Sequence, residues 1–171
     1  MMFQGFKETV LKRKLNQLIA QIDKSRTPSS KIINSIAVIA SADISSEVDL
    51  QKEIEKILKV KNIKIYSLRK FNKTDEFSHQ HFTEKDINWS GNFTQENFKC
   101  FLEEPFDLLI GFFNTNNVYL ERAVLESQAQ FKAGFAGVNS KLYEIEISEK
   151  IENVTIFTSE LKKYLQIIKK L

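Results

Sequence analysis

Two short polar segments carry the residues of this chain that are best placed to bind or transform a ligand. The first is SADISS, residues 41–46, and the second is NTNN, residues 114–117. Each follows an apolar run that predicts a strand buried on both faces. If these strands are neighbours in a parallel sheet, both segments lie at the edge where α/β proteins bind ligands. We therefore predict a candidate ligand-binding crevice lined by Ser41, Asp43, Asn114 and Asn116, in which Asp43 is the one plausible acid or base.

The composition of these segments argues against a bound nucleotide. Neither contains a glycine, whereas a phosphate cradle needs several backbone N–H groups that approach the ligand closely. The chain also lacks the G-x-G-x-x-G and G-K-[ST] motifs. Asn117 is more simply explained as the N-cap of a following helix, although an Asn-lined pocket for a small polar ligand stays open. We expect no cofactor.

The pair His79-Gln-His81 is the one histidine cluster of the chain. On a strand both imidazoles would share one face, and Asp75, Glu76 or Glu84 could complete a metal site. With no third histidine or cysteine in this polar stretch, we predict no metal site. No G-x-S-x-G motif is present, and pairs such as Glu103-Glu104 are typical of solvated positions, so we assign no catalytic residue.

Positive charge and a single aromatic residue define a candidate partner-binding surface. Residues 1–31 hold seven basic and two acidic side chains, a balance of +5 in a chain of formal net charge +3. Attraction to a polyanion would therefore concentrate in this segment, with Lys12, Arg13 and Lys14 at its centre. Trp89 lies in a long polar connection, where an aromatic side chain either anchors the loop or contacts a partner.

Length and composition place the chain in a broad class. The 171 residues suit one domain, and a hydrophobic content of 42% is enough for a packed core. No run of 18 apolar residues occurs, so we predict no transmembrane segment. The N-terminus does not read as a secretory signal, and the single Cys100 excludes an internal disulfide. We expect a cytoplasmic protein of unknown oligomeric state.

The apolar pattern predicts the elements that hold these residues. Residues 1–31 form an amphipathic helical arm that ends near Pro28, and residues 32–171 form a single α/β domain. Strands are expected at 32–40, 62–68, 107–113, 132–138 and 142–148. Helices fall between most of them, and a final helix at about 155–170 is expected to bury Phe157, Leu161, Tyr164, Leu165 and Ile168.

The order of the strands in the sheet can be predicted from which strands lie at its edges. Residues 62–68 and 142–148 alternate polar and apolar side chains, as edge strands do, whereas 107–113 is wholly apolar. The expected sheet therefore has five strands in the order 2-1-3-4-5, a flavodoxin-like or Rossmann-like arrangement. Because the link at 139–141 is too short for a crossover helix, the last strand is expected to pair antiparallel.

Two stretches of the chain resemble a known group of proteins. FDLLIGFFNTNNVYLERAVLESQAQFKAGFAG and FTEKDINWSG, with the closing helix, look like a family of short uncharacterised bacterial proteins. The resemblance covers nearly the whole chain. It implies no activity and no catalytic residues.

Two functions compete on this basis. The first is a non-catalytic interaction module whose basic arm contacts a partner such as a ribonucleoprotein through phosphate groups. The arm could instead contact an anionic membrane surface or a protein partner, or pack back on the domain as a structural helix. The second is a ligand-binding or enzymatic domain that uses the loops after strands one and three. We favour the first, and an exposed basic helix beside a filled crevice would support it.

Overall fold

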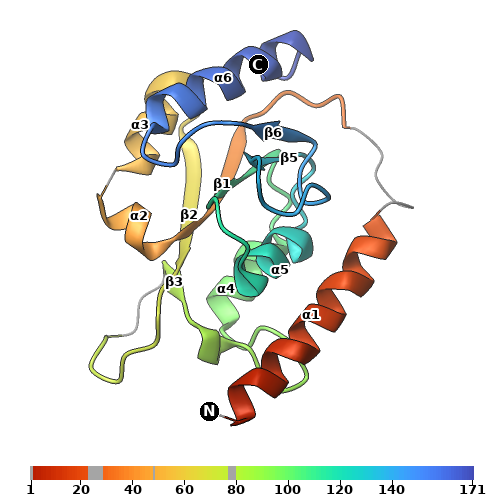
Figure 1. Ribbon diagram of the computed structural model, residues 1–171. Helices are drawn as coiled ribbons and strands as arrows, with labels where there is room; N and C mark the ends of the chain where they lie inside the picture. The colour runs from red at the N-terminus through yellow and green to blue at the C-terminus, as the bar shows by residue number, and fades with distance from the viewer. Residues whose placement is uncertain (1, 23–28, 48, 77–79) are drawn as a thin grey trace.

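The centre of the molecule is a sheet of six strands in which all neighbouring strands pair in parallel (Figure 1). The computed structural model describes residues 2–22, 29–47, 49–76 and 80–171. The strands are β1 (Ser35–Ser41), β2 (Asn62–Leu68), β3 (His81–Phe82), β4 (Leu108–Phe112), β5 (Lys132–Phe135) and β6 (Ile145–Ile147), in the order β3-β2-β1-β4-β5-β6. The class is α/β, as the alternation of strand and helix patterns predicted.

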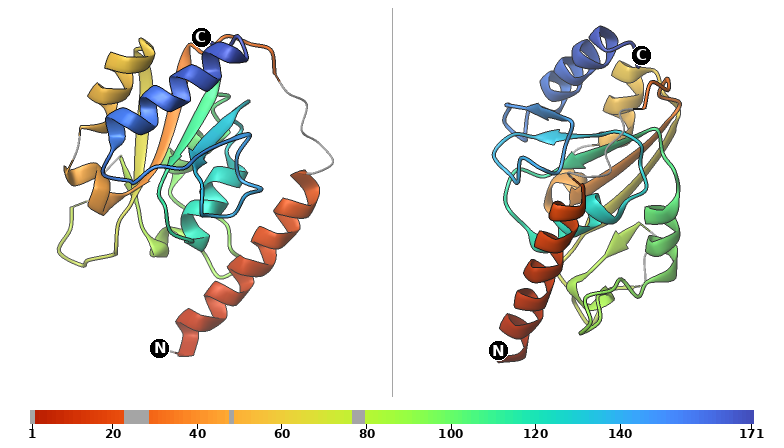
Figure 2. Two further views of the ribbon diagram at one scale, coloured as in Figure 1. Left: turned by 45° about the horizontal axis from the view of Figure 1, so that its top comes forward. Right: turned by 90° about the vertical axis from the view of Figure 1, so that its right-hand side faces the viewer.

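Both faces of the sheet are covered by helices (Figure 2). One face packs on α3 (Leu50–Leu58) and α6 (Val154–Ile167), and the other packs on α1 (Met2–Ile22), α4 (Glu96–Glu103) and α5 (Val118–Glu126). Residues of β1 alternate between them, since Val38 faces the α3/α6 layer and Ile39 the opposite one. A strand covered on both sides must be apolar throughout, which explains the continuous apolar runs of β1 and β4.

The count and the order of the strands differ from the expected sheet because β3 lies outside β2. No strand was expected between residues 68 and 107, yet His81 and Phe82 pair with Ser67 and Leu68. Phe82 is fully buried and stacks on Phe98 of α4, with ring centroids 4.1 Å apart. A strand this short has no detectable alternation, so the sequence pattern did not reveal it.

The expected antiparallel pairing of the last strand is wrong, because β6 runs parallel to β5. Residues 136–144 form the crossover without a helix, and they pack on the sheet through Leu142 and Tyr143, which are 0% and 4% exposed. A Cβ on Gly111 of β4 or Gly134 of β5 would lie 2.0 or 2.2 Å from the Tyr143 side chain. These two glycines let the tyrosine lie against the strands, so the crossover needs no helix to cover this part of the sheet.

The connection after β1 contains a short helix, α2 (Ala42–Glu47), in place of an open loop. Asp49 is the N-cap of α3, and its carboxylate accepts a hydrogen bond from the Lys52 N–H at 3.1 Å. A carboxylate at this position also suits the helix dipole.

Candidate functional site

Helix α1 packs along α5 and belongs to the core of that face (Figures 1 and 2). Leu11 is 0% exposed and Leu15 is 7% exposed. The arm is therefore a structural helix on its apolar side. The boundary proposed at residue 31 stays a prediction, because residues 23–28 lie outside the described part of the chain.

Two of the basic residues of α1 lie on its exposed side. Lys12 and Arg13 are exposed, and neither makes an ion pair with a residue that the structure describes. Lys14 is half-buried, and its ammonium donates a hydrogen bond to the Asn92 side chain at 3.0 Å. Of the three predicted partner-binding cations, Lys12 and Arg13 are thus available to a partner, and Lys14 fastens a neighbouring loop.

That loop contains Trp89 and is held against α1 at several points. Lys7 donates to the backbone carbonyl of Glu84 at 2.6 Å, and the buried Arg122 of α5 donates to the carbonyl of Gly91. Gly91 has φ +75°, and a Cβ there would lie 3.0 Å from the Arg122 guanidinium, so glycine suits both the turn and the close approach. Trp89 is 59% exposed on this anchored loop, beside the basic helix.

The predicted crevice residues lie at the carboxyl ends of β1 and β4, which are neighbours. Ser41 ends β1 and is half-buried, and Asp43 is exposed in the first turn of α2. Asn114 and Asn116 are both exposed beyond β4. The winding therefore brings the two segments to one edge of the sheet. Asp43 remains exposed at this edge, whereas acid–base chemistry favours a carboxyl that is shielded from solvent.

A buried carboxyl that the sequence analysis missed lies behind this edge. Asn117 is the N-cap of α5, as predicted, because its side chain accepts hydrogen bonds from the Tyr119 and Leu120 N–H groups at 3.0 and 3.2 Å. Glu121 accepts from the Asn117 N–H at 3.0 Å and is 5% exposed. Burial raises the pKa of Glu121, and hydrogen bonds from Asn117 and Asn139 oppose that rise.

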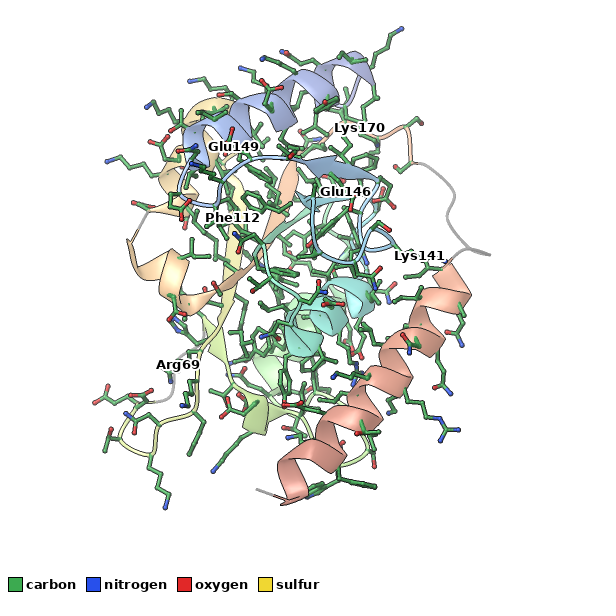
Figure 3. All side chains as sticks on the ribbon, in the orientation of Figure 1. Arg69, Phe112, Lys141, Glu146, Glu149 and Lys170 are labelled. Carbon is green, nitrogen blue, oxygen red and sulfur yellow. The ribbon has the colours of Figure 1, made fainter. Side chains whose placement is uncertain are left out.

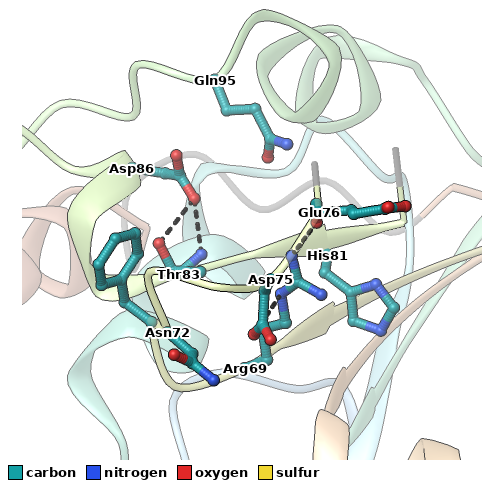
Figure 4. Close-up of a pocket in the computed structure, with 9 residues that line it drawn as sticks. Arg69, Asn72, Asp75, Glu76, His81, Thr83, Asp86 and Gln95 are labelled. Carbon is teal, nitrogen blue, oxygen red and sulfur yellow. Dashed lines mark hydrogen bonds and ion pairs between the residues drawn. The ribbon is translucent and has the colours of Figure 1, made fainter. Parts of the chain in front are cut away.

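A polar hollow of about 210 Å³ lies at a different pair of strand ends, those of β2 and β3 (Figure 4). Arg69 follows β2 directly and donates to the carbonyl of Glu76 at 2.7 Å, and its Nε lies 4.0 Å from the Asp75 carboxylate. Asp86 accepts from the N–H and the hydroxyl of Thr83, at 2.7 and 3.0 Å, in a capping box. The hollow is thus bounded by side chains that other parts of the loop hold in place.

His81 of β3 also lines this hollow. Burial lowers the pKa of His81 from 6.5, and the nearby Arg69 guanidinium lowers it further. The imidazole is therefore uncharged at neutral pH and can both donate and accept hydrogen bonds. The three lining carboxylates, Asp75, Glu76 and Asp86, outnumber the single guanidinium, so the hollow disfavours a polyanion and suits a small polar molecule.

The metal interpretation of the histidine pair receives no support from the part that the structure describes. His79 lies outside the described residues, and no group of three His, Cys, Asp or Glu side chains among those described is placed to hold a metal ion. Arg69, Thr83 and Gln95 of the hollow were not selected from the sequence. The rule that ligands bind at carboxyl ends of strands could have indicated Arg69 and Thr83, had β3 been recognised.

The fold is that of an α/β protein with a six-stranded parallel sheet. The chain belongs to a family of unknown function (DUF6913), whose model matches residues 7–168. This match confirms that the chain is a member of an uncharacterised family.

Two other comparisons found nothing. No curated protein matches the chain, and no solved structure matches it. Within the described residues, no helix combines the length and the apolar character that crossing a membrane requires.

Proposed function

We propose that this protein is a non-catalytic, cytoplasmic interaction module whose basic helix α1 contacts a ribonucleoprotein. One observation carries the proposal. Lys12 and Arg13 are consecutive, exposed and without an ion pair to any described residue, on a helix whose opposite side is anchored by Leu11 and Leu15. Because the helix is fixed in place, its charges are presented on a rigid surface, and little conformational entropy is lost when a partner binds.

Phosphate groups are the part of a ribonucleoprotein that such a surface would contact. Lysine and arginine displace condensed counterions when they neutralise phosphates, so binding weakens steeply as salt rises. Trp89, exposed on the loop that α1 holds, adds an aromatic surface on which an unpaired base could stack. We also propose a Rossmann-like or flavodoxin-like winding, since β1 and β4 are central neighbours whose connections leave toward opposite faces.

The proposal is tested by co-sedimentation with ribosomes from native lysate. The full-length chain is compared with the double variant Lys12→Glu/Arg13→Glu at low and high salt, with and without RNase. Deleting residues 1–31 would not be a fair test, because Leu11 and Leu15 are part of the core. We expect the wild-type chain to sediment with ribosomes at low salt and the variant to stay in the supernatant.

A matched control comes from α3 and the turn after it. Lys52 and Lys61 are exposed and, like Lys12 and Arg13, make no ion pair with a described residue. Lys52→Glu/Lys61→Glu changes the net charge by the same amount and should leave co-sedimentation intact. A wild-type chain that stays light at every salt concentration would contradict the proposal, and so would equal losses in the two double variants.

A small-ligand or enzymatic function is the second candidate. Sequence reasoning assigned it to the loops after β1 and β4, and the hollow at the ends of β2 and β3 offers the better-enclosed place. Screening small polar metabolites by thermal shift tests it, with Arg69→Gln as the comparison. A ligand that stabilises the wild-type chain and not this variant would support the second candidate.

A further inference from the structure

Four large apolar side chains on α6 and at its C-terminal end are exposed. Ile156, Tyr164 and Ile167 are 49%, 46% and 74% exposed, and Ile168 at the end of the helix is 45% exposed. These four make up half of the large exposed hydrophobic residues among those described. Single exposed apolar residues are ordinary, but several on one helix face indicate a surface that another molecule covers.

Helical geometry places four residues of this surface in a single row. Ile156, Glu160, Lys163 and Ile167 are separated by four, three and four positions, the spacing of one narrow stripe on an α-helix. The buried residues of α6, among them Phe157 and Leu161, lie on the opposite side and pack on the sheet. In Figure 2 the helix lies at the outside of the molecule, so the row points away from the protein.

The row is complementary to itself when it is reversed. An antiparallel two-fold axis midway between Leu161 and Lys162 would place Ile156 opposite Ile167 of a second copy, and Glu160 opposite Lys163. Each of these pairs occurs twice, because a two-fold interface exchanges the two partners.

We infer that the partner of this surface is a second copy of the same chain, bound through α6 in an antiparallel two-fold dimer. The charges support this occupant: Glu160 and Lys163 form an ion pair within the helix, and in the dimer each would also face the opposite charge of the other copy. Apolar pairs at both ends of the row would exclude water from the charged pairs between them.

The C-terminal end of α6 is held against the segment that precedes β1. The backbone carbonyl of Lys170 accepts a hydrogen bond from the Ile33 N–H at 3.0 Å, and the Lys170 ammonium, 4.8 Å from the centroid of the Phe131 ring, is directed back into the protein (Figure 3). Ile32, which is 60% exposed, therefore lies in the chain next to the end of α6. An interface of one helix per subunit is small, so we expect a dissociation constant in the micromolar range or weaker.

Sedimentation equilibrium of the full chain over a wide concentration range tests the dimer. We expect the average mass to rise from 19.9 kDa toward twice that value as concentration increases. Lys163→Glu and Glu160→Lys each place like charges across the axis, and each should raise the dissociation constant at least about tenfold. The double variant Glu160→Lys/Lys163→Glu restores opposite charges and should regain the dimer.

Mixing the two single variants provides the strictest arm of the test. One variant then carries two cations in the row and the other carries two carboxylates, so a mixed dimer should form more tightly than either variant associates with itself. Lys12→Glu is the matched control, since it reverses an exposed charge far from α6, and Ile167→Asp should abolish association. A chain that stays monomeric at every concentration would overturn the inference. A dimer that is indifferent to the single reversals would also overturn it, because another surface would then hold the copies together.

Discussion

The two faces of the sheet are built by different chemistry. On the α3/α6 face, rings and aliphatic side chains fill the core, and Phe112 of β4 lies between the sheet and α6 (Figure 3). On the α1/α5 face, the core contains Phe and Leu side chains but also buried polar groups, among them Arg122 and Glu121, which are 2% and 5% exposed. The first face is mainly an apolar layer, in which Thr158 and Lys170 are the buried polar residues at α6 and its end. The second face places buried charges within its core and uses them to join remote segments.

Arg122 shows what the second kind of packing requires. Its guanidinium contacts the carbonyl of Gly91 and the carboxylate of Glu126, and it lies 5.7 Å from the centroid of the Phe93 ring. Burial lowers the pKa of Arg122 to about 10, so it remains charged at neutral pH. A buried charge that holds a loop of distant sequence to a helix is sensitive to the loss of either partner, whereas an apolar layer is sensitive mainly to lost volume.

The largest effect is expected on the apolar face, from Phe157→Ala. Phe157 is 1% exposed, stacks on Phe135 with centroids 4.2 Å apart, and meets Phe112 edge-on at 5.4 Å. Removing the ring should lower the free energy of unfolding by about 3–5 kcal/mol, measured by urea denaturation. A loss below about 1 kcal/mol would show that this layer can collapse onto the gap, and the contrast between the two faces would then fail.

A steric test of the polar face comes next, from Gly111→Ala. The new Cβ would lie 2.0 Å from the Tyr143 hydroxyl and 2.7 Å from the ring, so the tyrosine must move. We expect a loss of about 1–3 kcal/mol in the free energy of unfolding. In the background Tyr143→Leu the same glycine change should have a smaller effect, and strictly additive losses would show that the two residues do not interact.

The contrast between the faces also explains what the sequence could predict. The runs at β1 and β4 are apolar throughout, so their central position could be recognised, and Asn117 could be assigned as an N-cap from local pattern alone. The burial of Tyr143 could not be predicted, because it depends on glycines in two other strands. The hollow around Arg69 and His81 could not be predicted either, because it forms only once β3 pairs with β2.

Helix α6 shows a different limit of periodicity. Phe157, Leu161 and Leu165 are buried as predicted, whereas Tyr164 and Ile168 are 46% and 45% exposed. An apolar pattern records which side chains avoid water, and it does not distinguish the core of one chain from a surface that a partner covers. The same ambiguity affects the amphipathic helix α1, where Phe6 is 65% exposed.

A smaller effect is expected at the start of α5, from Asn117→Ala. The substitution removes the acceptor for the Tyr119 and Leu120 N–H groups and should lower the free energy of unfolding by about 1 kcal/mol. Asn117→Asp keeps an acceptor at the helix N-terminus and should stay close to the wild type. Equal losses in both variants would mean that the position matters for a reason other than capping.

The smallest effect is a dependence of stability on pH that comes from Glu121 on the polar face. Burial raises the folded-state pKa of Glu121 above 4.5, so the folded protein favours the protonated carboxyl. The resulting stabilisation is present at pH values below the unfolded pKa and is lost as pH rises through the folded pKa. At pH values above the folded-state pKa, Glu121→Gln should therefore have a higher free energy of unfolding than the wild type. Below pH 4.5 the two chains should differ little in stability. Thermal unfolding of both chains from pH 4 to 8 measures this difference, and a gain that is uniform with pH would contradict the assignment.

We propose that the exposed side of α1 binds phosphate groups, and the salt dependence of RNA binding tests this most directly. The affinity of the full-length chain for a single-stranded RNA is measured between 50 and 200 mM salt, beside Lys12→Glu/Arg13→Glu and the α3 control. Each lost phosphate contact lowers the slope of log affinity against log salt by about 0.7 for single strands, so the α1 variant should bind more weakly with a slope shallower by about 1.4. Equal slopes and equal affinities for all three chains would contradict the account.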